Sequence, residues 1–262
     1  MIEPQNAPDS GAPRVALVTG AAGGIGRRLV YRLASQGTAV VAVDRAADAS
    51  KELRAMPGQV SIVQGDVADP WDVERFVSEA ERDVGPIDYL VNAVGVLRVG
   101  ATVDLTETEF EETFAVNTTG VFLVTRAVVA RMIPRRRGAI VTVSSNAAHT
   151  PRASMSAYSA SKAAATMLAK CAALEVAKYG IRCNVVSPGS TNTDMLRVSW
   201  ADEDRSDATI AGVPEQFRLG IPLGRIADPD DIVDAVEFLL SDRARHITMQ
   251  ELTVDGGATL GS

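Results

Sequence analysis

Short apolar runs alternate with longer amphipathic stretches along this chain. Seven runs rich in Val and Ile lack in-and-out alternation, which is typical of strands buried on both faces of a sheet. They lie at residues 15–20, 39–44, 61–66, 88–93, 139–145, 181–189 and 251–257. The amphipathic stretches between them predict helices at 24–36, 70–84, 106–132, 157–179 and 229–241. Alternating strands and helices predict an α/β fold with a parallel sheet and right-handed crossovers.

The length of 262 residues fits one such domain. The first 13 residues, MIEPQNAPDSGAP, are rich in Pro, Asn, Ser and Gly, so we expect a flexible tail followed by a single domain at 14–262. Residues 189–224 show no clear strand or regular helix. Because long loops in compact domains are usually functional, we expect this region to be a lid or a substrate-specificity loop.

Composition and charge exclude several classes of protein. A net charge of -7 argues against a nucleic-acid binder. Cys171 and Cys183 are too few for a disulfide scaffold and lack metal-site spacing, so we expect free thiols, a reducing cytoplasm and no bound metal. Arg126 and Arg131 interrupt the most apolar helical stretch, and the N-terminal residues lack the basic and apolar segments of a secretion signal. We therefore expect neither a membrane nor a nucleic acid as partner.

A glycine-rich turn, VTGAAGGIG (18–26), follows the first predicted strand and opens the first predicted helix. Its spacing, Gly20-x-x-x-Gly24-x-Gly26, differs from the usual G-x-G-x-x-G, and many tight strand–helix turns are equally rich in glycine. Its position nevertheless favours phosphate binding, because the helix N-terminus would offer N–H groups to a pyrophosphate.

Asp44 ends the second predicted strand, twenty residues after Gly24. A carboxylate there can accept hydrogen bonds from both ribose hydroxyls of NAD and would repel the 2′-phosphate of NADP. Alternatively, Asp44 only forms a turn at the end of the strand. The adjacent Arg45 could also accommodate the 2′-phosphate of NADP. Since the carboxylate holds the strand-terminal position, we expect NAD.

Tyr158 and Lys162 lie four residues apart on one face of a predicted helix. A free phenol with a pKa of about 10 is a poor base at neutral pH, but a nearby ammonium favours its ionised form. The pair could therefore accept a proton from a substrate hydroxyl. Alone it is weak evidence, because most such pairs are a half-buried phenol beside a solvated amine. Here the pair follows a strand that ends in Ser145, at the sheet edge where α/β folds bind ligands.

Together these motifs resemble the short-chain dehydrogenase/reductase family. The matching segments run in order over nearly the whole chain after residue 13: TGAAGGIG, NAVG (92–95), Asn117, Ser145, the Tyr158–Lys162 pair and SPGSTNTDM (187–195). The resemblance implies a Rossmann fold with a doubly wound, seven-stranded parallel sheet and helices on both faces. One departure is NAVG, where the family commonly has NNAG.

Carried over by position, the resemblance implies a role for each matching residue. Tyr158 would be the general base, and Lys162 would lower its pKa and hold the nicotinamide ribose. Ser145 would orient the substrate oxygen, and Asn117 would support a water that links Lys162 to solvent. The implied cofactor contacts are Gly20, Gly24, Ile25, Gly26, Asp44, Asp66, Val67, Asn92, Gly95, Tyr158, Lys162, Thr191 and Thr193.

Four longer segments resemble one subgroup, the 2,3-dihydro-2,3-dihydroxybenzoate dehydrogenases. They are AIVTVSSNAAHTPRASMSAYSASKAA, RCNVVSPGSTNTDM, QFRLGIPLGRIA and HITMQELTVDGGATLG. The resemblance implies that NAD+ oxidises the ring C3 hydroxyl of a cyclic hydroxy acid, and that the resulting ketone tautomerises to an aromatic catechol. It also implies a homotetramer with the helices near 106–132 and 157–179 at one interface.

The substrate acid requires a cation opposite its carboxylate, and a guanidinium matches a carboxylate in bidentate geometry. Arg152, six residues before Tyr158, is the favoured candidate and Arg98 the second; a surface loop arginine is the alternative for Arg152. Leu97 accompanies Arg98 in VLRVGA (96–101), which also fits the subgroup. Met195 and Leu196 open the long loop and are expected to line the ring pocket, although Met is equally common as core filler.

Three alternatives stay open. Leu196 stands where some dihydroxybenzoate enzymes are expected to have a polar side chain, so the substrate could carry an amine at C2, as in trans-2,3-dihydro-3-hydroxyanthranilate. The second alternative is an NADPH-dependent ketone or acyl-carrier reductase, against which Asp44 argues. The third is an inactive nucleotide sensor, against which the complete catalytic set argues.

Overall fold

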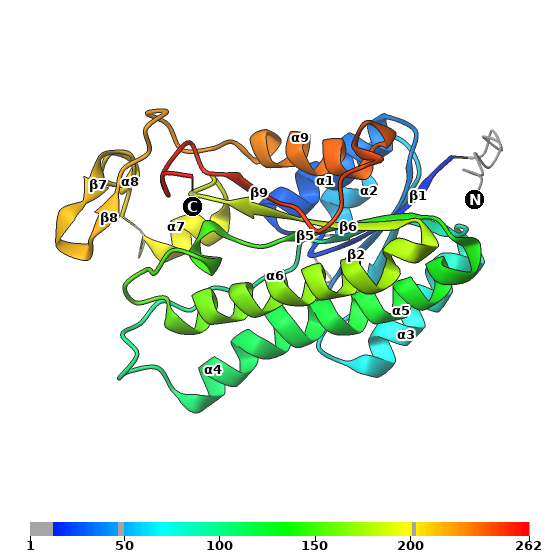
Figure 1. Ribbon diagram of the computed structural model, residues 1–262, viewed down its shortest axis with the longest axis horizontal. Coiled ribbons are helices and arrows are strands. Elements are labelled where there is room, and N and C mark those ends of the chain that lie inside the picture. The colour runs from blue at the N-terminus through cyan, green and yellow to red at the C-terminus, as the bar shows by residue number, and fades with distance from the viewer. Residues whose placement is uncertain (1–12, 47–49, 201–202, 262) are drawn as a thin grey trace.

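Seven parallel strands form the centre of the molecule (Figure 1). A computed structural model describes residues 13–46, 50–200 and 203–261, and the predicted tail at 1–13 lies outside these ranges except for its last residue. The strands are β1 Val15–Thr19, β2 Ala39–Asp44, β3 Val60–Gln64, β4 Ile87–Asn92, β5 Gly138–Val143, β6 Ile181–Pro188 and β9 Glu251–Val254. Their order is β3-β2-β1-β4-β5-β6-β9, so the direction of winding reverses between β1 and β4.

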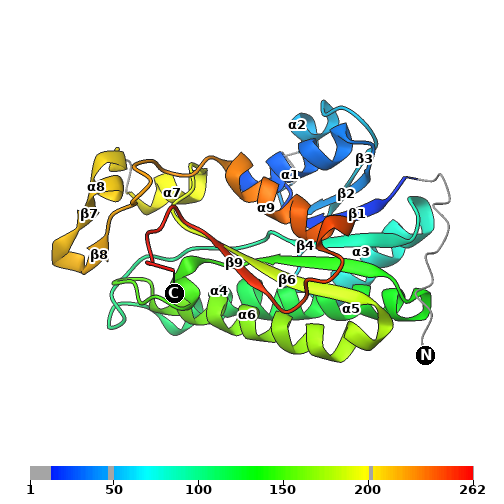
Figure 2. The same ribbon diagram turned by 45° about the horizontal axis from the view of Figure 1, so that its top comes forward.

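Helices cover both faces of this sheet (Figure 2). On one face lie α1 Gly24–Ser35, α2 Ser50–Arg54 and α9 Pro229–Leu240. On the other lie α3 Pro70–Asp83, α4 Glu107–Phe114, α5 Val121–Arg135 and α6 Ser156–Val176. The predicted doubly wound α/β fold and its parallel sheet are confirmed.

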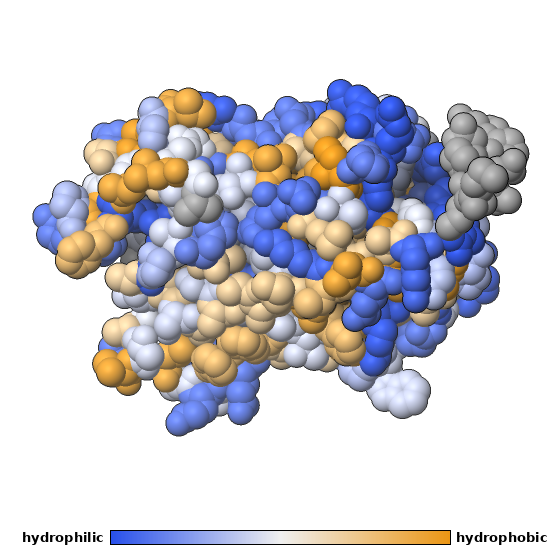
Figure 3. All heavy atoms as spheres, viewed as in Figure 1, coloured by the Kyte–Doolittle hydropathy of each residue, from blue (hydrophilic) through white to orange (hydrophobic). Residues whose placement is uncertain are grey.

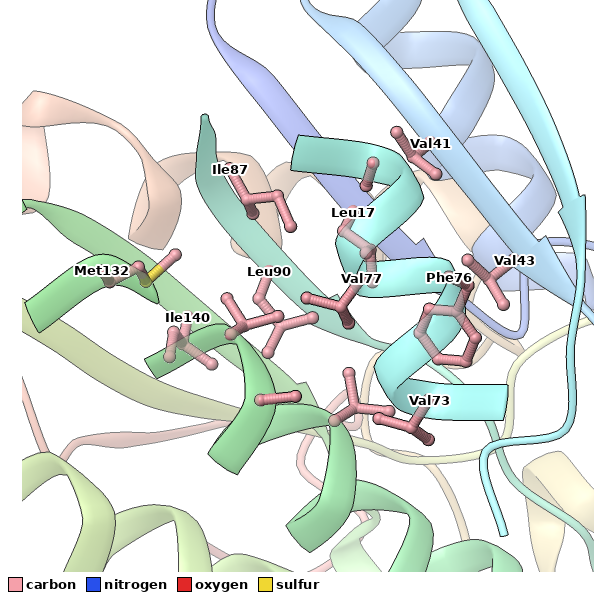
Figure 4. Packing of buried hydrophobic residues seen from close by; sticks show 14 of the residues in the cluster. Leu17, Val41, Val43, Val73, Phe76, Val77, Ile87, Leu90, Met132 and Ile140 are labelled. Atoms are coloured by element: carbon pink, nitrogen blue, oxygen red, sulfur yellow. The ribbon is translucent and has the colours of Figure 1, made fainter. Parts of the chain in front are cut away.

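Alternate residues of each strand supply two separate cores. Along β1, Leu17 packs in the cluster formed with α3 and α5, whereas Ala16 and Val18 pack in the cluster formed with α1 and α9. Figure 4 shows the first cluster, in which Phe76 of α3 and Val43 of β2 are neighbours. Burial of both faces is the reason why these strands are apolar at consecutive positions.

The helix predicted at 106–132 is longer and is not uniform. α4 and α5 are joined by a π-helical turn at Ala115–Gly120, within which Asn117 is fully buried. A π turn inserts residues without changing the apolar character of a helix, so the sequence pattern gives no sign of it. Such turns occur often at functional sites.

By length and composition alone, the segment Glu107–Arg135 could cross a membrane, and it is the one segment of the described chain with this property. It contains Arg126 and Arg131, and half of its most apolar window is buried inside the protein. The segment therefore packs as a core helix of this fold.

Residues 189–224 contain more regular structure than we predicted. They form α7 Asp194–Ser199, α8 Ser206–Ala211 and a hairpin of β7 Gly212–Val213 with β8 Arg218–Leu219. The expectation of no regular helix or strand was wrong because these pieces are too short to show a period, and neither helix has a capping side chain. The hairpin projects beyond the carboxyl ends of the strands, at the left of Figure 1.

Phe76→Ala is expected to lower the free energy of unfolding by about 3–5 kcal/mol, because the ring is completely buried between α3 and the sheet. Trp71→Ala on the same helix is the control, since Trp71 is 84% exposed and its loss should change stability by less than about 0.5 kcal/mol. Urea unfolding measures both values. Equal effects of the two substitutions would contradict the assigned packing of α3.

Candidate active site

The glycine-rich turn between β1 and α1 is tight enough to require its glycines. Gly20 has a φ of +69°, and a Cβ there would lie 2.6 Å from the Cα of Val94. A Cβ on Gly26 would clash with the carbonyl oxygen of Gly20. α1 begins without a capping side chain and without an acidic residue in its first turn. The helix therefore supplies no anion of its own to the N–H groups at its start, beside the groove.

The carboxylate of Asp44 closes one end of this groove. Its Oδ2 accepts a hydrogen bond from the N–H of Ala22 at 2.9 Å, and its Oδ1 accepts one from the N–H of Ala46 at 3.0 Å. Arg45 is directed toward Asp66, with 3.9 Å between guanidinium and carboxylate, and its side chain is 76% exposed. Two backbone donors therefore fix the carboxylate at the end of β2, while the arginine stays in solvent.

The structure gathers most of the predicted cofactor residues around one continuous hollow. Its groove is lined by Gly20, Gly24, Ile25, Gly26, Asp44, Asp66, Val67, Gly95 and Thr193. The adjoining cavity, with a volume of about 170 Å³, shares Ile25, Gly95 and Thr193 with the groove and adds Thr191. A cavity of this size admits a small molecule.

Asn92 is the predicted cofactor residue whose side chain is directed elsewhere. Its Nδ2 donates to Thr125 Oγ1 at 3.1 Å and to Thr142 Oγ1 at 3.4 Å, on the face of the sheet covered by α5. The side chain is almost fully buried and does not line the hollow. Asn92 therefore joins β4, β5 and α5 rather than contacting a ligand through its amide.

Tyr158 and Ser145 meet at the floor of the cavity. Ser145 Oγ accepts a hydrogen bond from the N–H of Ala147 at 3.1 Å, which leaves its own proton for the phenol oxygen of Tyr158. Both side chains are buried. Burial raises the pKa of Tyr158 above its ordinary value, and the hydrogen bond from Ser145 acts in the opposite direction.

Lys162 lies one helical turn further along α6 and is also buried. Its Nζ donates to the carbonyl oxygen of Val143 at 3.0 Å and lies 6.0 Å from the centre of the Tyr158 ring. A Cβ on Gly95 would come within 3.1 Å of this nitrogen, so the glycine leaves the ammonium its space. Burial lowers the pKa of Lys162 to about 8.

This pair corrects one part of the sequence argument. We expected Lys162 to lower the pKa of Tyr158, but in the structure the group that lowers it is the hydroxyl of Ser145. The physical reason is that desolvation disfavours the charged form of both buried groups, and the ammonium is turned toward the carbonyl of Val143 rather than the phenol oxygen.

Asn117 lies behind the cavity wall and does not line the cavity. Its Oδ1 accepts a hydrogen bond from the N–H of Val96, and its Nδ2 donates to the carbonyl of Val96 and to Ser161 Oγ, all at 2.9–3.0 Å. Ser161 in turn donates to the carbonyl of Tyr158 at 2.8 Å. The amide in the π turn thus joins the loop after β4 to α6 near Tyr158.

Four of the five predicted substrate residues line the cavity: Leu97, Arg152, Met195 and Leu196. Arg98 does not; it is half exposed and pairs with Glu112 at 3.4 Å. The structure adds Arg218 of β8 to the cavity wall. Sequence reasoning missed Arg218, although it lies within the matching segment QFRLGIPLGRIA, because no local pattern shows that a hairpin returns it to the site.

Comparisons with known proteins agree with this geometry. A family model described as short chain dehydrogenase matches residues 14–204. The chain belongs to the short-chain dehydrogenase family. It is 50% identical over 252 residues to a 2,3-dihydro-2,3-dihydroxybenzoate dehydrogenase of Bacillus subtilis, covering 95% of this chain and 97% of that protein. It is 47% identical to the Escherichia coli protein of the same name, covering 94% and 96% of the two chains.

A solved structure, that of levodione reductase, shares the architecture. It superposes with a TM-score of 0.87 at 29% identity, covering 95% of this chain and 98% of that one. As a short-chain dehydrogenase, the chain is an oxidoreductase, and its family implies a nicotinamide cofactor. The residues present fit such a group, because the uncapped start of α1 suits a pyrophosphate and the fixed carboxylate of Asp44 suits a ribose.

Ser145→Ala is expected to raise the pKa of Tyr158, because it removes the hydrogen bond that lowers it while burial persists. The sequence has four tyrosines, so carbon NMR of tyrosine-labelled protein can follow each phenol, and the signal absent from Tyr158→Phe identifies the one of interest. Ser144→Ala is the control, since the Ser144 hydroxyl bonds to Thr166 Oγ1 and to the backbone carbonyl of Lys162 and not to the phenol. An unchanged or lower pKa in Ser145→Ala would contradict the assigned hydrogen bond.

Proposed function

We propose that this short-chain dehydrogenase oxidises the C3 hydroxyl of 2,3-dihydro-2,3-dihydroxybenzoate with NAD+, giving 2,3-dihydroxybenzoate. One observation carries the proposal: a single small cavity holds a buried tyrosine–serine pair and the guanidinium of Arg152. A proton acceptor and a carboxylate-binding group together suit a small hydroxy acid. The names of the two relatives support the same substrate.

The chain's own residues would control the proton of the substrate alcohol. Ser145 Oγ would hold the C3 oxygen and Tyr158 Oη would take its proton as the C–H bond breaks. NAD+, when bound, supplies the acceptor for the hydride that leaves C3. Lys162, charged below its pKa of about 8, would hold the nicotinamide ribose, and the hydrogen bond from Ser145 would favour the ionised phenol.

The oxidised product is a ring ketone that becomes an aromatic catechol by tautomerisation. A proton leaves C2 and one is gained by the C3 oxygen, so no further oxidant is needed. Aromatic stabilisation makes the overall reaction effectively irreversible. The protein must therefore supply only the first step, the removal of one proton and one hydride.

We assign NAD rather than NADP as the cofactor. The carboxylate of Asp44, held by two backbone N–H groups, would accept the ribose hydroxyls and repel a 2′-phosphate. Arg45 is exposed and directed to Asp66, which supports the same choice. Asp66 and Val67 would contact the adenine, and Thr191 and Thr193 the nicotinamide amide.

A second candidate substrate is trans-2,3-dihydro-3-hydroxyanthranilate, which carries an amine at C2. The observation behind it is the apolar side chain of Leu196 in the cavity wall, which offers no polar group that would select a hydroxyl over an amine at C2. Arg152, Tyr158 and Ser145 would act on both acids in the same way, so the two candidates differ only at C2.

We also propose a cytoplasmic homotetramer. Large apolar side chains are exposed on the face formed by α4, α5 and α6, namely Phe110, Phe122, Met167 and Leu174. In Figure 3, apolar residues gather over these helices in the lower half of the view. Exposed apolar patches of this kind favour association with another copy of the chain.

The direct test is reduction of NAD+ or NADP+ by the purified protein with each of the two dihydro acids. We expect turnover with NAD+, and Tyr158→Phe should lower kcat by about 10²–10⁴-fold while NAD+ still binds, because only the proton acceptor is lost. Tyr31→Phe, a partly exposed tyrosine on α1, should behave like the wild type.

Three results would overturn parts of this account. A preference for trans-2,3-dihydro-3-hydroxyanthranilate over 2,3-dihydro-2,3-dihydroxybenzoate would replace the first proposed substrate by the second. A strong preference for NADP+ would favour a ketone or acyl-carrier reductase. Full activity of Tyr158→Phe would remove Tyr158 from the chemistry.

A further inference from the structure

Two arginines from distant parts of the sequence enter the same cavity. Arg152 lies in the loop before α6, and Arg218 lies on β8, in the hairpin that projects from the sheet edge (Figure 1). Both guanidinium groups are partly buried, and burial lowers the pKa of each below its ordinary value. No carboxylate of the described chain lies within ion-pair distance of either group.

The two charges are close enough to disfavour each other. The charge of Arg152 lowers the pKa of Arg218 further, as expected for like charges in a partly desolvated space. Asp255 is the acidic group that acts on Arg152, and it raises the pKa of that arginine without forming an ion pair. Its Oδ2 accepts hydrogen bonds from Asn146 at 3.2 Å and from Thr259 at 2.7 Å. The carboxylate is therefore already engaged by neutral donors.

The hairpin holds Arg218 in place through one hydrogen bond to the sheet edge. Arg218 Nη2 donates to Ser190 Oγ at 2.8 Å, which leaves further N–H donors of the guanidinium for a ligand. β7 and β8 have two residues each, so the hairpin that carries this side chain is short. A ligand anion between the arginines would relieve their repulsion and tie the hairpin to the loop before α6.

We propose that Arg218 is the second arm of a carboxylate clamp whose first arm is Arg152. The inference rests on the proposed function, since the anion is the carboxylate of the substrate acid. Each guanidinium offers a planar fork that matches a carboxylate. The clamp holds one end of the ring while Tyr158 and Ser145 hold the C3 oxygen, so an acid is oriented at two points and a neutral alcohol at one.

The test compares Arg218→Met and Arg152→Met with Arg205→Met. Arg205 lies in the same region of the chain, is exposed, pairs with Glu203 at 3.2 Å and does not line the cavity. Each variant is assayed with the dihydrodiol acid and with its neutral carboxamide. We expect KM for the acid to rise about tenfold to a hundredfold in Arg218→Met, with KM for the carboxamide and kcat nearly unchanged. Arg218→Lys, which keeps a point charge, should restore part of the affinity.

A binding measurement separates this inference from the proposed function. Isothermal titration of the reaction product, 2,3-dihydroxybenzoate, and of plain benzoate measures the clamp without turnover. We expect Arg218→Met to weaken both ligands, and its melting temperature without ligand to equal or exceed that of the wild type, because a repulsion is removed.

The outcomes of these experiments distinguish failure of the proposed function from failure of the carboxylate clamp. Wild-type protein that binds benzoate through Arg218 but turns over neither dihydro acid would refute the proposed function and keep the clamp. Wild-type affinity for the carboxylates in Arg218→Met would overturn the clamp. An equal loss for acid and carboxamide in that variant would also overturn it, because it would show that Arg218 only supports the fold.

Discussion

Burial of an amine beside a phenol at the carboxyl edge of the sheet is the constraint on which the site depends. Lys162 and Tyr158 project from the same face of α6 into a space closed by the ends of β4 and β5. Desolvation acts on both and lowers the pKa of Lys162 to about 8 while raising that of Tyr158. Burial therefore disfavours the charged form of both groups, and the hydrogen bond from Ser145 is the contact that favours the ionised phenol.

The charges around the hollow divide it into two ends with different tasks. Asp44 gives the groove end a fixed negative charge, and Arg152 and Arg218 give the cavity end a positive one. The first arrangement suits hydroxyl groups of an unphosphorylated ribose, and the second suits an acid. The groove lies at the point where the strand order reverses, between the ends of β1 and β4, which is where α/β folds bind their ligands, and Tyr158 lines the adjoining cavity. The fold and the charges therefore indicate the same place for the cofactor and the acid substrate, the groove and its adjoining cavity.

What could be predicted from the sequence depended on whether the signal was local. Some features depend only on residues that are close together in the sequence. They are the apolar strands, the turn at Gly20–Gly26 and the spacing of Tyr158 and Lys162, and the structure contains all of them. The π turn that buries Asn117, the direction of the Asn92 side chain and the arrival of Arg218 in the cavity depend on contacts between distant segments. The same holds for the pKa of Tyr158, because its direction is set by burial, which no spacing reveals.

Titration of Lys162 tests the central claim most directly. The sequence has four lysines, so NMR of lysine-labelled protein gives a spectrum simple enough to follow each amine, with Lys162→Met identifying the buried one. The account predicts that Lys162 loses its proton near pH 8 in the ligand-free protein. A Lys162 that titrates together with the other lysines, at or above the ordinary value of 10.5, would show a solvated amine and contradict the account.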